Sequence, residues 1–174
     1  MQNEIKKIIF LPKSIQIYKQ NNLILVKSLN QYIRIKLPQE ITLLHKKSML
    51  ILKSNVSTAE LITWLFLFKN IILGLTRNFS ERLQLKGVGF KASQIAVNKI
   101  EFKIGYSHTI LYTSLIGTKV EVSKNILLQI KSPLKNLVGQ EAANLQKLRK
   151  PDIYKGKGIL YKGEKLNLKI GKKA

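Results

Sequence analysis

The sequence predicts an α+β protein with two duplicated small domains, each an antiparallel sheet with one helix packed on one face, followed by a basic C-terminal tail. Three observations predict this fold. Apolar residues alternate at period two over two stretches, a segment with a helical apolar face follows each stretch, and the same order occurs twice. The order assigns residues 1–80 to the first domain, 81–148 to the second and 149–174 to the tail.

The first domain begins with short strands. Within residues 8–53, apolar side chains alternate with other residues at Ile15 and Ile17, Leu23 and Leu25, Ile33, Ile35 and Leu37, and Met49 and Ile51. A helix is expected over 56–75, because Ser57 and Glu60 have the spacing of a capping box. Its apolar face comprises Leu61, Trp64, Leu65, Phe68, Ile72 and Leu75.

The apolar part of this helix, Leu61–Leu75, could be mistaken for a membrane span. A span needs roughly 20 mostly apolar residues. This segment is shorter and contains Lys69 and Asn70. A buried core helix is therefore favoured.

The second domain repeats the pattern. Strands are expected within 82–131, at Leu83, Leu85 and Val88, at Ile100, Phe102 and Ile104, at Ile110 and Tyr112, at Val120 and Val122, and at Ile126, Leu128 and Ile130. The second helix is expected to start with Ser132 as N-cap and Pro133 at its first position, and to end before Pro151. Its apolar face comprises Leu134, Leu137, Val138, Ala142, Leu145 and Leu148.

Two pairs of segments align the repeats with each other. Residues 22–27 correspond to residues 98–103, and residues 51–54 correspond to residues 129–132. Few identities are shared, but element order and spacing agree. An internal duplication follows.

The charge predicts a polyanionic partner. Thirty-one Lys and Arg face nine Asp and Glu, which leaves a net charge of +22. Such an excess destabilises a free compact domain through self-repulsion, unless nucleic acid or an anionic membrane supplies negative charge. The charge is dense in residues 149–174, where nine basic residues accompany two acidic ones.

Enzymatic chemistry is not expected. There are no cysteines, so thiolate metal sites and cysteine nucleophiles are excluded. The acidic residues are scattered, with no pair at helical spacing to act as acid and base. The two histidines, His45 and His108, are too few for a zinc site. The sequence predicts no catalytic residue, no metal site, no cofactor and no small-molecule substrate.

Residues 87–92 have the spacing G-x-G-x-x-A of a dinucleotide-binding turn. That site needs a helix directly after the glycines, and a strand-like stretch follows instead. The favoured alternative is a bend between strands, flanked by Lys86 and Lys91, whose glycines let the backbone approach a phosphodiester chain. His108, in a turn-like segment, could contact a base or phosphate, or only fill a local hydrogen bond.

The start of the tail alternates cations, glycines and an aromatic ring. Arg149 and Lys150 are followed by Tyr154-Lys-Gly-Lys-Gly158. Lysine contacts phosphate as a point charge, glycine permits close approach and tyrosine can stack on a base. The alternative is a disordered, solvated terminus. The regular pattern favours nucleic-acid binding.

Four motifs together resemble the family of the sixth universal protein of the large ribosomal subunit. They are Leu85-Lys-Gly-Val-Gly-Phe-Lys-Ala92, Ile104-Gly-Tyr-Ser-His108, Val138-Gly-Gln-Glu-Ala-Ala-Asn-Leu145 and Tyr154-Lys-Gly-Lys-Gly-Ile159. They occur in the family's order over about half of the chain. Departures occur at Thr109, where the family has proline, and at Asp152-Ile153, where it has Glu-Pro.

The resemblance implies a structural protein that binds large-subunit ribosomal RNA near the sarcin–ricin loop and the base of the stalk, where translation factors bind. Its expected partners are that RNA and neighbouring large-subunit ribosomal proteins, and no membrane is expected. The residues expected at or near the RNA are Lys86, Gly87, Gly89, Lys91, Tyr106, His108, Arg149, Lys150, Tyr154, Lys155, Gly156, Lys157 and Gly158, with Lys172 and Lys173 as general charge.

The N-terminus resembles neither a signal peptide nor a transit peptide, so we expect synthesis in the compartment where the protein works. The abundance of Lys, Ile and Asn indicates an A/T-biased genome, as in many organelles. With the departures from the family pattern, this favours the mitochondrial matrix, with a plastid or a bacterial cytoplasm as alternatives. The competing function is a membrane-surface protein that uses the apolar helix 61–75 and the Lys-rich tail.

Overall fold

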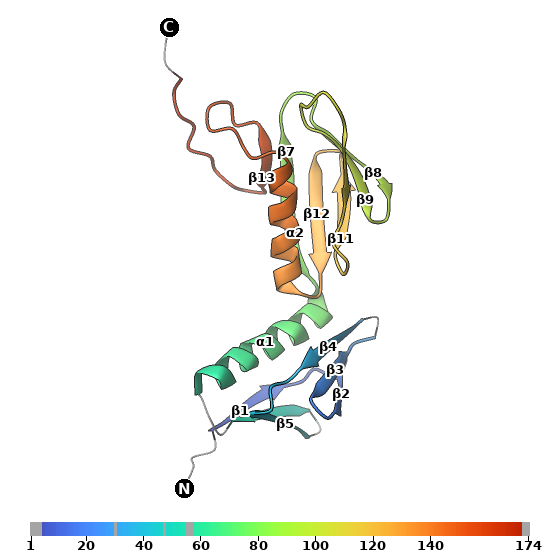
Figure 1. Cartoon of the computed structure of the whole chain (residues 1–174), viewed down its shortest axis with the longest axis vertical. Coiled ribbons are helices and arrows are strands. Elements are labelled where there is room, and N and C mark those ends of the chain that lie inside the picture. Colours follow the sequence, from blue (N-terminus) through green and yellow to red (C-terminus); the bar gives the residue numbers. More distant parts are fainter. Residues whose placement is uncertain (1–4, 30, 47, 55–57, 172–174) are drawn as a thin grey trace. The chain divides into compact units, whose positions relative to one another are not determined.

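The computed structural model describes residues 5–29, 31–46, 48–54 and 58–171. The chain divides into two compact units, Met1–Asn78 and Phe79–Ala174 (Figure 1). Each unit combines antiparallel sheets with one helix, so the predicted α+β class and the duplication are confirmed.

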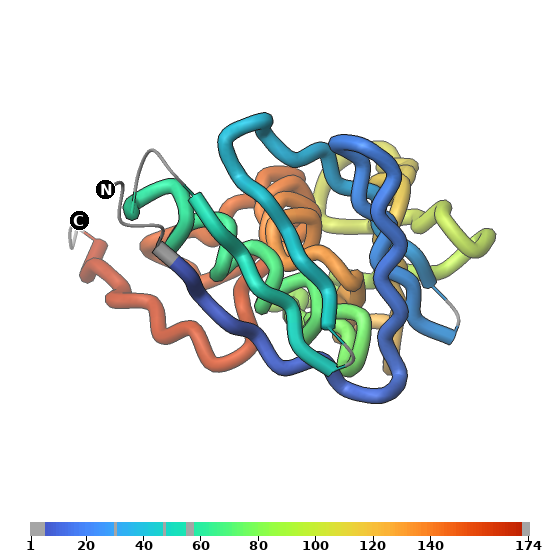
Figure 2. Tube along the Cα trace, turned by 90° about the horizontal axis from the view of Figure 1, so that it is seen from below, coloured from blue at the N-terminus to red at the C-terminus, as the bar shows by residue number. Residues whose placement is uncertain are grey.

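The described residues of unit 1 form six strands and one helix. The strands are β1 (Ile5–Phe10), β2 (Gln16–Gln20), β3 (Leu23–Lys27), β4 (Tyr32–Lys36), β5 (Ile41–Lys46) and β6 (Met49–Ser54), and the helix is α1 (Thr58–Arg77). They form two three-stranded sheets, in the orders β1-β6-β5 and β2-β3-β4. Figure 2 shows the neighbouring chain segments of β1 and β6 running side by side. Helix α1 packs on β1 and β6.

Unit 2 has the same plan with one additional strand. Its elements are β7 (Phe79–Lys86), β8 (Lys91–Ala96), β9 (Lys99–Lys103), β10 (Ile110–Thr113), β11 (Lys119–Ser123), β12 (Leu127–Ser132), α2 (Lys135–Leu148) and β13 (Gly158–Tyr161). The sheets have the orders β10-β9-β8 and β11-β12-β7-β13. Helix α2 packs on β7, β12 and β13.

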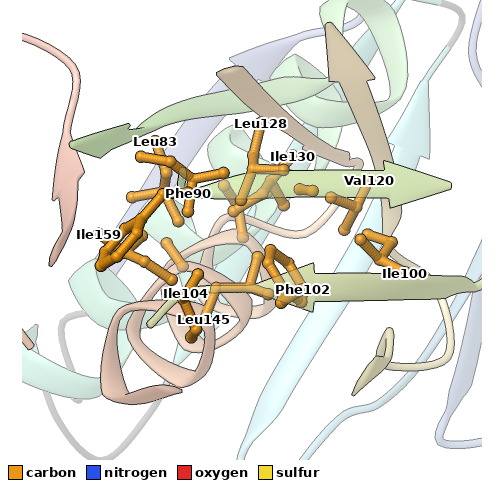
Figure 3. Packing of buried hydrophobic residues seen from close by; sticks show 14 residues of the cluster. Leu83, Phe90, Ile100, Phe102, Ile104, Val120, Leu128, Ile130, Leu145 and Ile159 are labelled. Carbon is orange, nitrogen blue, oxygen red and sulfur yellow. The ribbon is translucent and has the colours of Figure 1, made fainter. Parts of the chain in front are cut away.

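The core of unit 2 lies between its sheets and α2. Leu83, Phe102, Ile104, Leu128 and Leu145 have no exposed surface. Figure 3 shows these side chains converging from β7, β9, β12 and α2, together with Ile159 from β13. Burying an aliphatic or aromatic side chain of this size stabilises a fold by roughly 1.5–3 kcal/mol. This core holds β7, β13 and the end of α2 together.

The start of α2 differs from the prediction. The N-cap residue is Leu134, which makes no side-chain cap hydrogen bond, and the helix begins at Lys135. Ser132 instead ends β12 and is buried, where its hydroxyl donates to the carbonyl of Gly117 at 2.8 Å. Ser132 Oγ also accepts a 3.3 Å bond from the amide of Leu134. The predictions that Ser132 is the N-cap and Pro133 the first helical residue were nevertheless wrong, because both residues precede the N-cap Leu134. In unit 1, Ser57 lies outside the described residues.

Other element boundaries also differ from the sequence predictions. Val88 lies in a turn rather than in a strand. Strands β1 and β5 were not predicted as separate elements, and residues 158–161 of the predicted tail form β13. Part of the expected tail is therefore a strand of the unit 2 sheet.

Candidate nucleic-acid interface

Strand β13 brings two distant predicted site residues together. It pairs antiparallel with β7, and Gly158 stands opposite Lys86. Ile159 and Leu160, which follow Gly158 in β13, are both buried, and Ile159 belongs to the core of unit 2. The turn after β7 and the segment before β13 therefore meet at one end of the sheet.

The segment before β13 folds into a compact loop. The amide of Ile159 donates to the carbonyl of Arg149 at 3.0 Å, and the amide of Asp152 donates to the carbonyl of Lys157 at 2.9 Å. The side chain of Asp152 accepts a 2.9 Å bond from the amide of Tyr154. These bonds close the loop on itself.

Gly158 is required where the loop returns to the sheet. Its φ is +151°, and an added Cβ would lie 2.6 Å from Cα of Pro151 and 2.9 Å from the carbonyl oxygen of Lys150. These are backbone atoms, which cannot rotate away as a side-chain terminus can. Only glycine permits this close approach.

The turn after β7 is built on Phe90. The ring is buried, and a Cβ on Gly87 would lie 2.8 Å from it. A Cβ on Gly105, which has φ +80°, would lie 3.0 Å from the same ring. Phe90 thereby connects the turn at 87–90 with the loop that carries Tyr106 and His108.

Tyr106 connects that loop with the end of α2. Its hydroxyl donates to the carbonyl of Leu148 at 3.1 Å, and the guanidinium of Arg149 lies 4.8 Å from its ring centre. The ring of His108 stacks on Tyr106 at a centroid distance of 6.2 Å. Because its hydroxyl is bonded and its ring packs against two neighbours, Tyr106 positions Arg149 and His108.

These contacts join three segments into one surface, which we call the basic end: residues 86–91, 105–108 and 149–158. The structure brings together all the predicted site residues up to Gly158, while Lys172 and Lys173 lie outside the described residues. The cations of this surface are Lys86, Lys91, Arg149, Lys150, Lys155 and Lys157, and Asp152 is its single acid. All are exposed except Arg149, which is half-buried.

Three contributors to the basic end were missed from the sequence. Phe90 and Pro151 are the surfaces against which the glycines pack, and Asp152 closes the loop. The spacing of Asp152 and Tyr154 is a signal that could have revealed the local turn.

Behind the basic end, α2 contributes a buried carboxyl group. Glu141 has no exposed surface, and its Oε2 accepts a 3.2 Å bond from the amide of Leu115. Burial raises the pKa of Glu141. Burial and the neighbouring carboxylate of Glu141 also raise the pKa of Tyr112 to about 12. This pair sits within the α2 packing and not on the basic end.

Glu121 on β11 has its pKa shifted in the opposite direction to that of Glu141. Its carboxylate lies 2.7 Å from Nζ of Lys131 and 3.1 Å from Nζ of Lys119. The hydrogen bonds from these two cations lower its pKa.

Within the described part of the chain, no three His, Cys, Asp or Glu residues gather where they could hold a metal ion.

Helix α1 has the length and apolar composition of a membrane span. Leu61, Leu65, Phe68, Ile72 and Leu75 are nevertheless buried. The helix is longer than the segment Leu61–Leu75 on which the sequence argument against a span depended, but its buried face packs on β1 and β6 as expected of a core helix.

Comparisons with known proteins define the class of the chain. A family model described as "Ribosomal protein L6" matches residues 86–162, which include β8 to β13 and the whole basic end. The large ribosomal subunit protein uL6 of Pseudothermotoga lettingae is 32% identical over 97% of each chain. That of Bdellovibrio bacteriovorus is 40% identical over 62% of this chain and 59% of its own length. The uL6c protein of Guillardia theta is 37% identical over 63% of this chain and 61% of its own length.

These relatives identify a structural, non-enzymatic ribosomal protein. The chain belongs to the uL6 family of the large ribosomal subunit. The resemblance inferred from the four motifs is thereby confirmed, and the full-length relatives extend it across unit 1.

Proposed function

We propose that the protein stabilises large-subunit ribosomal RNA through the basic end, near the factor-binding region formed by the sarcin–ricin loop and the stalk base. The observation that carries this proposal is the convergence of six cations with two glycine-dependent turns at one end of unit 2. The position near the factor-binding region is inferred from the family.

The chemistry of the basic end suits a sugar–phosphate backbone. Lysine side chains and loop amides neutralise and position phosphates without reading bases. Hydrogen bonds within the loop hold the backbone from which its cations extend, so less backbone entropy is lost when RNA binds. A-form RNA recognised this way is selected by shape. Tyr154 is 60% exposed and remains available to stack on an unpaired base.

A charge-reversal pair tests the proposal. In the full chain, Lys155→Glu with Lys157→Glu should weaken binding to large-subunit ribosomal RNA and reduce the slope of log K against log salt by about 2. Lys27→Glu with Lys36→Glu, an exposed pair on β3 and β4, changes the net charge equally and serves as the control. Equal losses in both variants would show that only overall charge matters, and would refute the proposed interface.

We also propose that the protein works in the mitochondrial ribosome. The A/T-biased composition and the departures at Thr109 and Asp152 support an organelle. Similarity to the uL6c protein of Guillardia theta keeps the plastid as the alternative. Cell fractionation followed by immunodetection distinguishes them, since co-sedimentation with plastid or cytoplasmic ribosomes would refute the mitochondrial assignment.

A further inference from the structure

The two units differ at one edge of equivalent sheets. Strand β7 is paired on one side with β12 and on the other with β13. Its counterpart in unit 1 is β1, which pairs with β6 on one side only and, among the described residues, lies at the edge of its sheet. An edge strand presents unpaired backbone groups that can accept a further strand.

The register shows which residues correspond. Ile9 pairs with Leu50 as Leu83 pairs with Leu128. The amide of Leu11 donates to the carbonyl of Ser48 at 2.8 Å, just as that of Leu85 donates to Ile126 at 2.9 Å. The residues that pair with β13, 83–86, therefore correspond to residues 9–12.

The same register identifies the outward-facing backbone groups. The carbonyl of Arg82 accepts from the amide of Lys162, so residues 82 and 84 point toward β13. Their counterparts in unit 1 are Ile8 and Phe10. The side chains of these two residues are 53% and 71% exposed.

An open groove occupies the place that β13 fills in unit 2. It has a volume of about 540 Å³ and is lined by Ile8, Ile9, Phe10, Pro12, Lys69, Ile72, Leu73, Thr76 and Arg77. In unit 2, β13 packs against both β7 and α2. The groove likewise has β1 on one side and the second half of α1 on the other.

Charge indicates the occupant. Two cations, Lys69 and Arg77, and the polar Thr76 border a groove whose other lining residues are apolar. With a net charge of +22, a second copy of this chain is electrostatically unfavourable, and so is its own Lys-rich segment after residue 161. Acidic side chains would complement the two cations.

We propose that β1 and this groove bind an extended, apolar segment with acidic side chains from another protein, which adds to the sheet as an antiparallel strand. Backbone bonds to Ile8 and Phe10 would hold the strand, and the apolar lining would take alternate side chains. The inference concerns unit 1 alone and does not depend on RNA binding by the basic end.

The test uses the full chain and a fluorescein-labelled peptide of sequence EEILYVE, followed by fluorescence anisotropy. Wild type should bind it saturably. Phe10→Pro removes an outward N–H at an edge position, where proline is tolerated, and should weaken binding about tenfold. Lys69→Glu with Arg77→Glu should weaken it further, whereas the equal charge change of Lys27→Glu with Lys36→Glu should have a much smaller effect.

Four results would overturn the proposal. The first is no saturable binding, and the second is an equal loss in the groove pair and the control pair. The third is tighter binding of a labelled peptide of residues 163–174, which would make the chain's own C-terminal segment the occupant. The fourth is a dimer in sedimentation that the acidic peptide dissociates, which would make the occupant a second copy. Circular dichroism and Trp64 fluorescence check that the Phe10→Pro variant keeps its overall fold.

Discussion

Gly158→Ala tests the geometry of the basic end. The new Cβ would lie 2.6 Å from Cα of Pro151, whereas an ordinary contact begins at 3.4 Å, so the backbone must move by at least 0.8 Å. Such a shift would stretch the 3.0 Å bond between the Ile159 amide and the Arg149 carbonyl beyond hydrogen-bond range. A lost bond at a buried amide costs about 0.5–1.5 kcal/mol, and strain at a glycine-only φ adds about 1–3 kcal/mol.

We therefore expect Gly158→Ala to destabilise unit 2 by about 2–4 kcal/mol. Hydrogen–deuterium exchange of the β7 and β13 amides measures this directly, and Trp64 fluorescence reports unit 1 separately. Gly163→Ala is the matched control, since Gly163 has φ +92° but no atom within 4 Å of an added Cβ. If Gly158→Ala costs no more than Gly163→Ala, the close approach to Pro151 does not hold the loop.

Three further substitutions probe unit 2. Glu141→Gln should stabilise the protein at neutral pH. Burial raises the pKa of Glu141, so the protein loses free energy of unfolding as the pH rises above about 4.5 and this buried carboxyl group ionises. Urea unfolding should therefore show a gain at neutral pH and no gain at pH 4. Glu121→Gln should instead lower the free energy of unfolding by up to about 1 kcal/mol at neutral pH, because Lys131 and Lys119 stabilise the ionised carboxylate and lower its pKa. The loss should be smaller in acid or high salt, and a gain in stability would contradict this reasoning. Tyr106→Phe removes the bond to Leu148 and should cost about 1 kcal/mol in unit 2 exchange, with unchanged exchange as the contrary result.

Local patterns predicted much of the fold. Residues 22–27 and 98–103 fall on β3 and β9, and residues 51–54 and 129–132 fall within β6 and β12, as the internal alignment predicted. Period-two alternation identifies such strands because one face of each is buried. The duplication was visible because both copies kept this pattern.

Elements with a different pattern were harder to predict. Strand β1 has apolar residues on both faces, with Ile9 buried and Ile8 exposed, so it shows no alternation. Strand β13 is a short apolar run inside a basic segment, and charge dominated its interpretation. The run Ile159–Tyr161 could have indicated a buried strand.

The residues of the basic end were predictable as types, but not as one surface. Lys86 and Gly158 are brought together by a strand pair between distant segments, which no local signal specifies. Tyr106 was expected only at or near the RNA, and its contact with Arg149 also depends on packing that the sequence does not specify. Sequence therefore indicated the chemistry, and the long-range pairing of β7 with β13 supplied the geometry.

The most direct test of RNA binding at the basic end is a cryo-electron microscopy map of the native large subunit that contains this chain. The account predicts RNA phosphates within hydrogen-bonding distance of the 149–158 loop and of the turn between Lys86 and Lys91. A map in which both turns face solvent or protein, with RNA contacting other surfaces of the chain, would contradict it.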